Sequence, residues 1–569
     1  MKKKLLVILL SLCVAITSAF TLAACRGKNN NNGGNVDNGG GSSTTTTDDG
    51  KTDNKDNSTT DDGKTDEGKT DDGDENTERK ATEGLEFGFI DDETTQVTGY
   101  KGTDAEVYIP SMQGSKRVTR IKADAFAGNR VITSVEMGDN VAEIGDRAFN
   151  GCQNLTSVKI GTGVKSIGNQ AFYDCSGLTT AAIPDSVTKM GYKAFQNCTG
   201  LTSATIGSGL TEIDNETFRD CTGLTSVTIG SGVTIIGQDA FRTCTKLADV
   251  TISGNVAQIE AGTFVDCSSL TNIEIPNSIR AVGVTAFNDT GLTFTEDDGA
   301  RYLGNSGNKY LVLIEAKDKE AITNYDINAS TKVIADLAFR KCENLTTVSI
   351  PDSVTDIGVQ AFSSCGELSN LTMSYGLLTI GQEAFASCIR LTGLTIPDSV
   401  TDIGQFAFRD CQQLAKVTVG GGVMTIGEHA FHGCNELTDI MLPDTLTEIP
   451  AYMFYGCTKL SNITLPSSLT SIEGNAFSGC TSLSRVEIPS GVTYIGNWAF
   501  NNCTSLSNVT IPGGVTTIGV QAFAYCTSFT EITIPLSVRS MDREVFIGCT
   551  GLTKINCEAE SWKAVSGGW

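Results

Sequence analysis

The sequence predicts a repeat solenoid, a stack of short coils with parallel β-strands, from three regular features. The phrase "IGDRAFNGC", ending at Cys152, recurs as "IGNQAFYDC", ending at Cys175, and continues with a step of 23 residues. Phenylalanine holds one position of this step in two runs, 126–287 and 339–546, so that 18 of the 24 phenylalanines share one column. Between these phrases, segments such as "LTSVTI" alternate β-branched residues, as strands do. A fixed period of this kind is typical of stacked repeats, because one repeat cannot bury its apolar face alone.

The first 24 residues have the features of a lipoprotein signal peptide. "MKKK" supplies the positive end, and an apolar stretch follows it up to "LAAC", which ends at Cys25. Small residues before this cysteine resemble the lipobox of bacterial lipoproteins. The resemblance implies cleavage before Cys25 and a lipid on its sulfur, which would anchor the protein to the bacterial membrane. An uncleaved membrane anchor and an ordinary cleavage site remain the alternatives.

Residues 25–83 comprise the cysteine expected to carry the lipid and an acidic linker rich in Gly, Asn, Thr and Asp. The stretch "TTTTDDGKTDNKDNSTTDDGKTDEGKTDDGDE" contains almost no residue that could be buried in a core. We therefore expect a disordered spacer that lifts the repeats off the membrane.

Each 23-residue coil divides into three parts with different local preferences. "LTSVTI" predicts a strand, "PDS" or "GTG" a turn, and "VTDIG" a second short extended piece. The phrase "xxAFxxC" is too short for a stable helix and is interpreted as one helical turn that returns the chain to its start. In the stack, the Leu, Val, Ile, Phe and Cys positions should form continuous internal ladders.

The full pattern, L-x-x-V-x-I-P-x-x-V-x-x-I-G-x-x-A-F-x-x-C, resembles the BspA-type leucine-rich repeats of bacterial surface proteins. The resemblance covers about 450 residues and implies a curved right-handed solenoid with a parallel β-sheet on its concave face. The broader leucine-rich pattern has an asparagine where Gly163 and Ser186 stand here. Turn and cysteine positions must therefore close these coils.

Two departures from the period divide the chain into segments. Between Cys267 and Cys342 lie three periods plus six residues, and strand-like "YLVLIEA" in this stretch predicts a β-island. Five extra residues also interrupt the pattern near the start of the array. The predicted segments are an N-terminal cap (84–117), a first repeat block (118–290), the β-island (291–330), a second repeat block (331–549) and a C-terminal cap (550–569).

The cysteines of the repeat are predicted to be buried thiols. Sixteen of the 19 cysteines share one column, where neighbours lie about 4.8 Å apart with parallel Cβ vectors. Disulfide bonds need converging Cβ atoms, so pairing would distort the coils. A disulfide stays an alternative because exported proteins often contain them. A single column also cannot surround a zinc ion.

The composition argues against several functional classes. A net charge of −24 should repel nucleic acid. The two histidines, His429 and His432, stand on one return turn without evident carboxylates that would orient them as metal ligands, and Cys434 is expected to point into the core. No constellation meets the geometric needs of catalysis, so we expect neither enzymatic activity nor a metal or cofactor.

One run of outward positions departs from its polar surroundings. Five residues before the cysteine, most coils have a polar residue, but aromatic rings replace it in the second block, and a position three residues later adds two more rings. These side chains form a candidate ligand-contact stripe, because exposed aromatic patches are favoured binding sites. The stripe consists of Phe406, His429, His432, Tyr452, Tyr455 and Trp498.

These features together predict a lipid-anchored protein at the bacterial cell surface. The family resemblance implies binding or adhesion to host matrix proteins, host cells or other bacteria, with an extracellular protein or glycoprotein as partner. A module that binds glycans or cell-wall polymer and a passive surface spacer are the alternatives.

Overall fold

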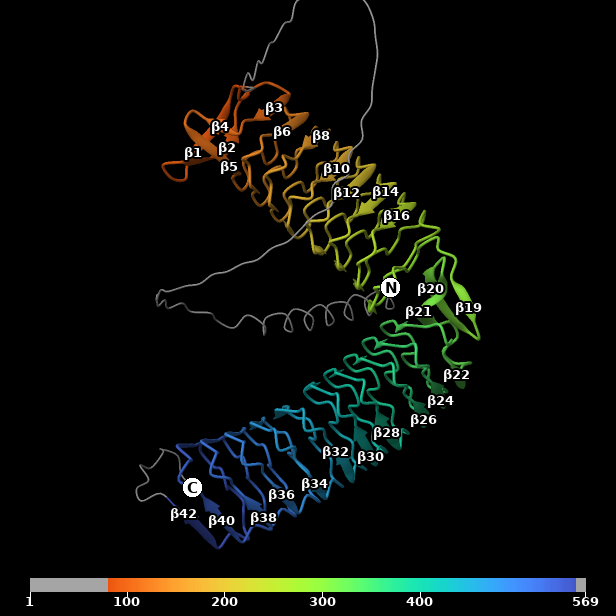
Figure 1. Ribbon diagram of the computed structural model, residues 1–569, viewed down its shortest axis with the longest axis vertical. Helices are drawn as coiled ribbons and strands as arrows, with labels where there is room; N and C mark the ends of the chain where they lie inside the picture. Colours follow the sequence, from red (N-terminus) through yellow and green to blue (C-terminus); the bar gives the residue numbers. More distant parts are fainter. Residues whose placement is uncertain (1–79, 559–569) are drawn as a thin grey trace, which may run out of the picture. The chain divides into compact units, whose positions relative to one another are not determined.

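Each coil contains two short strands and a run of turns, except that residues 268–290 form only the second strand, and the coils stack in chain order (Figure 1). The computed structural model describes residues 80–558. The predicted signal peptide with Cys25, nearly all of the predicted linker and residues 559–569 lie outside this range. Within it, no helix is long and apolar enough to cross a membrane.

The first strand of each coil coincides with the "LTSVTI" segment, and its side chains alternate between core and solvent. In β12, for example, Ala204 and Ile206 are buried whereas Thr205 is exposed. Neighbouring first strands pair in parallel and in register within several short sheets. They are β3 (Glu106–Ile109), β6 (Ser134–Met137), β8 (Ser157–Lys159), β10 (Thr180–Ile183), β12 (Ser203–Ile206), β14 (Ser226–Ile229), β16 (Asp249–Ile252), β22 (Asn324–Asp326), β24 (Thr347–Ser349), β26 (Asn370–Thr372), β28 (Gly393–Ile396), β30 (Lys416–Val419), β32 (Asp439–Met441), β34 (Asn462–Ile463), β36 (Arg485–Glu487), β38 (Asn508–Thr510), β40 (Glu531–Ile534) and β42 (Lys554–Cys557).

The second strand of each coil coincides with the "VTDIG" segment, as the sequence predicted. These strands are mostly two residues long and also pair in parallel with the next coil. They are β5 (Lys116–Ile121), β7 (Glu143–Ile144), β9 (Ser166–Ile167), β11 (Lys189–Met190), β13 (Glu212–Ile213), β15 (Ile235–Ile236), β17 (Gln258–Ile259), β18 (Ala281–Val282), β23 (Val333–Ile334), β25 (Asp356–Ile357), β27 (Thr379–Ile380), β29 (Asp402–Ile403), β31 (Thr425–Ile426), β33 (Glu448–Ile449), β35 (Ser471–Ile472), β37 (Tyr494–Ile495), β39 (Thr517–Ile518) and β41 (Ser540–Met541).

The expected helical turn in "xxAFxxC" is wrong, because two residues of this return turn adopt a left-handed backbone. In the coil that ends at Cys175 these are Gln170 (φ 54°) and Asp174 (φ 57°), and the same two positions have positive φ in the other coils. Such residues cannot continue a right-handed helix. Consequently only alternate N–H groups bond within the turn, such as that of Tyr173 to the Gln170 carbonyl at 3.1 Å.

The remaining N–H groups of the return turn bond to the next coil. Those of Gln170 and Phe172 donate to Tyr192 and Ala194 at 2.9 and 2.8 Å. The glycine that opens the phrase permits this close stacking, since a Cβ on Gly168 would lie 2.5 Å from the Asp146 nitrogen. The return turn is therefore a third hydrogen-bonded ladder along the solenoid.

The core consists of ladders of identical residues. The Phe149 and Phe172 rings stack at 5.1 Å with planes 1° apart, and the other phenylalanine pairs within each block stack similarly. Beside them, fifteen of the sixteen column cysteines donate their Sγ–H to the phenylalanine carbonyl of the preceding coil, as Cys152 does to Phe126 at 3.0 Å. All are free thiols, so the prediction of unpaired cysteines is confirmed.

Three antiparallel strands interrupt the stack where the sequence predicted a β-island. They are β19 (Thr295–Asp297), β20 (Ala300–Asn305) and β21 (Asn308–Ala316), and β21 rejoins the array by pairing in parallel with β23. Their side chains alternate between two separate cores. Leu303 and Val312 pack with the first block, whereas Tyr302 and Leu313 pack with the second.

The N-terminal end of the array is closed by another antiparallel pair. Strand β1 (Leu85–Phe89) pairs with β2 (Thr94–Tyr100), and β2 runs parallel to β5. A short strand, β4 (Met112–Gln113), forms a hairpin with β5. The first parallel coil therefore already begins at β3, inside the segment that the sequence assigned to the cap.

Candidate functional site

The candidate stripe lies on the return turns that follow β29, β31 and β33 in the second block. Five of its six predicted residues come together there, and we call them the aromatic cluster: Phe406, His429, His432, Tyr452 and Tyr455. Because return turns of successive coils stack in register, side chains at one position form a row along the solenoid.

The aromatic cluster has two rows of stacked rings. In the first row, the His429 ring stacks between Phe406 at 4.5 Å and Tyr452 at 4.4 Å, measured between centroids. In the second row, His432 stacks on Tyr455 at 4.8 Å with planes 8° apart. The rows contact each other through His429 and His432 at 5.3 Å and through the two tyrosines at 5.8 Å. Tyr455 has the largest exposed fraction, 39%.

The first row stands on a strained backbone. Phe406, His429 and Tyr452 have φ values of 59°, 59° and 57°, in the left-handed region. A bulky aromatic residue is rare in this region, where Gly, Asn and Asp are far better tolerated. The array imposes this conformation on every coil, so the aromatic residues are held there by the fold against their own preference.

The two histidines are in direct contact and are held neutral. Their Nδ1 atoms lie 3.3 Å apart. Burial and repulsion from His432 and Arg409 lower the pKa of His429 to about 4. Burial also lowers the pKa of His432, although the nearby Asp410 carboxylate opposes the effect. Two imidazoles alone do not make a metal site, and residues 80–558 hold no group of three or more possible His, Cys, Asp or Glu ligands.

Sequence reasoning did not identify Arg409, which belongs to this surface. Its guanidinium lies 4.9 Å from the Phe406 ring centroid, in cation–π geometry. It also forms ion pairs with Asp410 at 3.4 Å and Glu383 at 3.8 Å. The sequence carried one signal of its role, because Arg409 occupies the second-row position in the coil before that of His432.

Trp498 is separated from the aromatic cluster. The coil between them has Asn475 in the first-row position, so the ladder of rings ends at Tyr452. The Trp498 indole is 38% exposed and donates to the Gln521 side-chain oxygen at 3.0 Å. Trp498 is thus an isolated aromatic residue in the first-row position, two coils beyond Tyr452.

The cysteine nearest the histidines is not a reactive nucleophile. Cys434 is fully buried, and its Sγ–H donates to the Phe408 carbonyl at 3.3 Å. Burial raises the pKa of this thiol well above its ordinary value. A thiol in this state does not form the thiolate that cysteine chemistry needs.

Comparison with known families matches both repeat blocks to one description, "BspA type Leucine rich repeat region (6 copies)". The matched segments are residues 105–224, 193–298, 317–438 and 424–553, which together span most of the chain. No curated protein matches the chain.

Several solved structures are also similar in sequence over much of the chain. A leucine-rich repeat protein from Bacteroides ovatus is 23% identical, with 83% of this chain and 93% of that chain covered and a TM-score of 0.36. A structure described as a leucine rich cell surface protein from Faecalibacterium prausnitzii is 30% identical, with 63% and 93% covered and a TM-score of 0.30. The pneumococcal vaccine antigen PcpA is 17% identical, with 73% and 92% covered and a TM-score of 0.24. At these TM-scores the likeness carries no argument about ligands.

Proposed function

The chain belongs to the BspA-type leucine-rich repeat family, and from this premise we propose that it is a bacterial cell-surface protein that binds other molecules without catalysis. The proposed partner is an extracellular protein or glycoprotein of a host or of other bacteria. The proposed contact site is the aromatic cluster with Arg409. The observation that carries this proposal is the double row of stacked rings, whose first row stands on a strained backbone.

Retention of aromatic rings at a strained position supports a binding role over a passive spacer. In the first block the same backbone position has polar residues such as Lys193 and Glu216 with similar φ values. Polar residues therefore satisfy the needs of the fold. The aromatic residues of the second block add no core packing, and their presence is better explained by a contact with another molecule.

Ring geometry favours a protein partner over a glycan. Sugars stack on the open face of an aromatic ring, but in the first row the two faces of His429 are covered by Phe406 and Tyr452. The stack therefore presents mainly ring edges, together with the Arg409 guanidinium. Tyrosine and arginine at the centre of a patch are typical anchors of protein interfaces.

The binding site can be tested with a triple variant of the full chain. We expect Phe406→Ser, Tyr452→Ser and Tyr455→Ser together to weaken binding to an immobilised matrix glycoprotein by roughly 10- to 100-fold, since anchor residues contribute most of an interface's free energy. A screen of matrix proteins against a glycan array identifies the partner, and surface plasmon resonance measures the affinity.

The matched control changes the equivalent positions of the first block: Gln170→Ser, Glu216→Ser and Arg219→Ser. This variant should retain wild-type affinity. Equal affinity of both triple variants, with circular dichroism showing both folded, would exclude the aromatic cluster as the site. Binding to glycans alone would favour the glycan-binding alternative.

Surface attachment is proposed to occur through a lipid on Cys25, a residue outside the described part of the chain. We expect Cys25→Ser to abolish incorporation of a fatty-acid probe in metabolic labelling, because the thioether that carries the lipid cannot form. Cys13→Ser, in the apolar part of the same signal, serves as the control and should label normally. Equal labelling of the Cys25 variant would contradict the lipoprotein assignment.

A further inference from the structure

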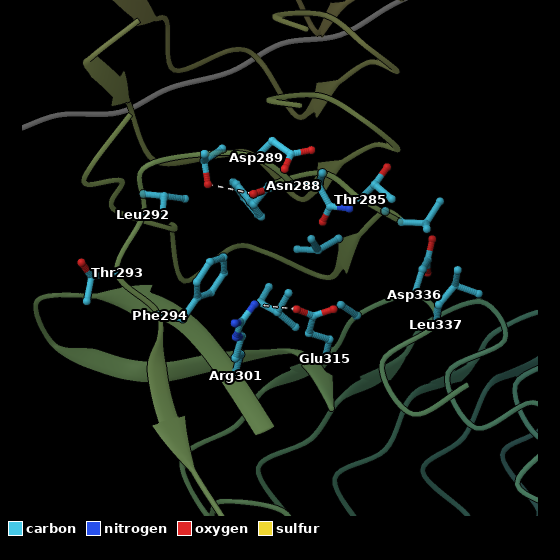
Figure 2. A pocket seen from close by; sticks show the side chains of 18 of the residues that line it. Thr285, Asn288, Asp289, Leu292, Thr293, Phe294, Arg301, Glu315, Asp336 and Leu337 are labelled. Atoms are coloured by element: carbon cyan, nitrogen blue, oxygen red, sulfur yellow. Dashed lines mark hydrogen bonds and ion pairs between the residues drawn. The ribbon is translucent and has the colours of Figure 1, made fainter. Parts of the chain in front are cut away.

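A cavity of about 830 Å³ lies where the β-island interrupts the stack of return turns. Figure 2 shows it between Thr285, Asn288 and Asp289 of the last first-block coil and Asp336 and Leu337 of the first second-block coil. Arg301 and Glu315 of the island line its floor. The island hairpin contains no "xxAFxxC" phrase, so this level of the solenoid lacks a return turn.

Three backbone donors of the coil before the cavity have no acceptor among residues 80–558. In a regular coil, three N–H groups of the return turn donate forward to the next coil, as Gly262, Phe264 and Asp266 do at 3.0, 2.8 and 3.1 Å. Their equivalents in the next coil are Thr285, Phe287 and Asp289. In the described part of the chain, none of these three N–H groups has a hydrogen-bond partner.

The Phe287 donor is the most informative of the three. Its residue is only 4% exposed, and it lines the cavity. A backbone N–H without a partner in a buried residue is rare in folded proteins, because a missing hydrogen bond is unfavourable. An unpaired donor of this kind indicates a position where a ligand oxygen would be stabilised.

The opposite side of the cavity presents carbonyl groups. Regular coils accept at three carbonyls, whose equivalents here are those of Asp336, Ala338 and Arg340, and of these residues Asp336 lines the cavity. Ala338 accepts from the island residue Ala316 at 2.8 Å, whereas the other two have no donor among residues 80–558. The two sides of the cavity together offer a backbone edge that resembles a missing rung of the ladder.

We propose that this cavity binds a short peptide segment of a partner protein, which completes the missing return turn. Its carbonyls would accept from Thr285, Phe287 and Asp289. Recognition through a free backbone edge is a common mode of peptide binding. The site is separate from the aromatic cluster and does not depend on it.

The charged residues that line the cavity determine which peptides it should favour. Four acidic residues, Asp289, Glu296, Glu315 and Asp336, line the cavity against two basic ones, Arg301 and Lys319. Arg301 is already paired with Glu315 at 3.0 Å and Glu296 with Lys317 at 2.8 Å, which leaves Asp289 and Asp336 against Lys319. The site should therefore favour a basic or neutral peptide and disfavour an acidic one, including this chain's own acidic linker.

The solenoid supplies its own matched probes, because its return turns have the required carbonyl spacing. A fluorescent peptide copying residues 187–198, "VTKMGYKAFQNC" with serine in place of Cys198, carries two lysines. A peptide copying residues 210–221, "LTEIDNETFRDC" with the same replacement at Cys221, carries four acidic residues and one arginine. By fluorescence anisotropy with the full chain, the basic peptide should bind at least about tenfold more tightly than the acidic or a scrambled basic peptide.

A blocking variant tests the location. Asn288 is an exposed cavity residue, so Asn288→Trp should fill the cavity without disturbing the core and weaken binding of the basic peptide by about tenfold or more. Asn150→Trp, at the equivalent position of the coil that ends at Cys152, should leave the affinity unchanged. Absence of binding, equal binding of the scrambled peptide or equal affinity of the two variants would overturn the proposal.

Hydrogen exchange measured by mass spectrometry distinguishes the possible occupants. The amides of Thr285, Phe287 and Asp289 should exchange rapidly in the free chain and become protected when the basic peptide is added. Protection in the free chain at every concentration would assign the cavity to a segment of this chain. Protection that grows with protein concentration would assign it to a second copy, and either result would overturn the proposal.

Discussion

The two repeat blocks share a backbone but differ in what they display on it. Glu216 in the first block and Tyr452 in the second occupy the same position of the return turn, with φ values of 55° and 57°. Around Glu216 the surface is charged, with Lys193 at 3.4 Å and Arg219 at 2.8 Å. Around Tyr452 the surface is aromatic.

This difference teaches that the outward face of the return turn is independent of the fold. Phenylalanine ladders, thiol hydrogen bonds and both strand ladders run through both blocks with the same geometry. The scaffold fixes where a side chain stands, and the residue placed there decides what the surface can contact. A binding surface can therefore change without any change of the core.

The largest expected effect tests whether the two blocks share a core as well as a backbone. The buried residues form two separate clusters divided by the island. We therefore expect two unfolding transitions. Phe431→Ala should destabilise the second block by about 3–5 kcal/mol through cavity formation and leave the first block nearly unchanged, and Phe241→Ala should do the reverse.

Calorimetry and urea unfolding followed with one tryptophan or fluorophore in each block measure these changes. Phe87→Ala is the control, because this ring is only partly buried against the first core and its truncation should cost less. A single transition that both core variants lower equally would show that the island couples the blocks into one cooperative unit.

Much of this architecture could be predicted from the sequence, because the period itself encodes it. Positions of Ile144, Phe149 and Cys152 recur so regularly that only one stacking register buries them all. The helical turn was not predictable in the same way. Left-handed residues at Gln170 or Tyr452 arise from hydrogen bonds to the next coil, and those residue types do not by themselves indicate such a backbone.

The candidate site was only partly readable from the sequence. Column spacing placed Phe406, His429 and Tyr452 in one row, and the structure stacks their rings. Arg409 was missed because a charged residue on a turn is ordinarily solvated. The cavity at the island was also missed, since unpaired donors such as the Phe287 N–H depend on the absence of a neighbouring coil.

A prediction of intermediate size is that the stability of the second block depends on pH through its histidines. Both histidines of the chain lie in the second block, and both have a lowered pKa, that of His429 falling to about 4. Between pH 6.5 and 4 the unfolded chain therefore binds more protons than the folded one. The histidine contribution to stability is fully present above pH 6.5 and is lost as the pH falls through this window.

Carboxyl groups with a raised pKa oppose this trend. Partial desolvation raises the pKa of Glu212 and Glu260 in the first block and of Glu448 in the second, and that of Asp336 to about 6. Stability from these groups is fully present below their unfolded pKa and is lost as the pH rises through the folded value.

The contribution of the histidines to stability is therefore obtained as the difference in stability between wild type and the double variant His429→Asn with His432→Asn. We measure this difference as the change in melting temperature of the transition that belongs to the second block. It should shrink as the pH falls from 7 to 4. The corresponding first-block variant, Gln170→Asn with Tyr173→Asn, should give a difference that does not depend on pH over this range. The same slope in both variants would contradict the assigned pKa directions.

The smallest expected effect concerns the conformational strain itself. Trp498 has a φ of 56°, is 38% exposed and keeps one side-chain hydrogen bond, to Gln521. Asparagine tolerates a left-handed backbone better than tryptophan, and Asn475 already stands at this position one coil earlier. Trp498→Asn should therefore stabilise the second block by about 0.5–1 kcal/mol in urea unfolding. Glu216→Asn should gain less stability, because it also removes the ion pairs with Lys193 and Arg219.

A loss of stability in the tryptophan variant would mean that the indole is held in place by packing. A gain would mean that the chain keeps this ring at the expense of stability, as expected of a residue that contacts a partner.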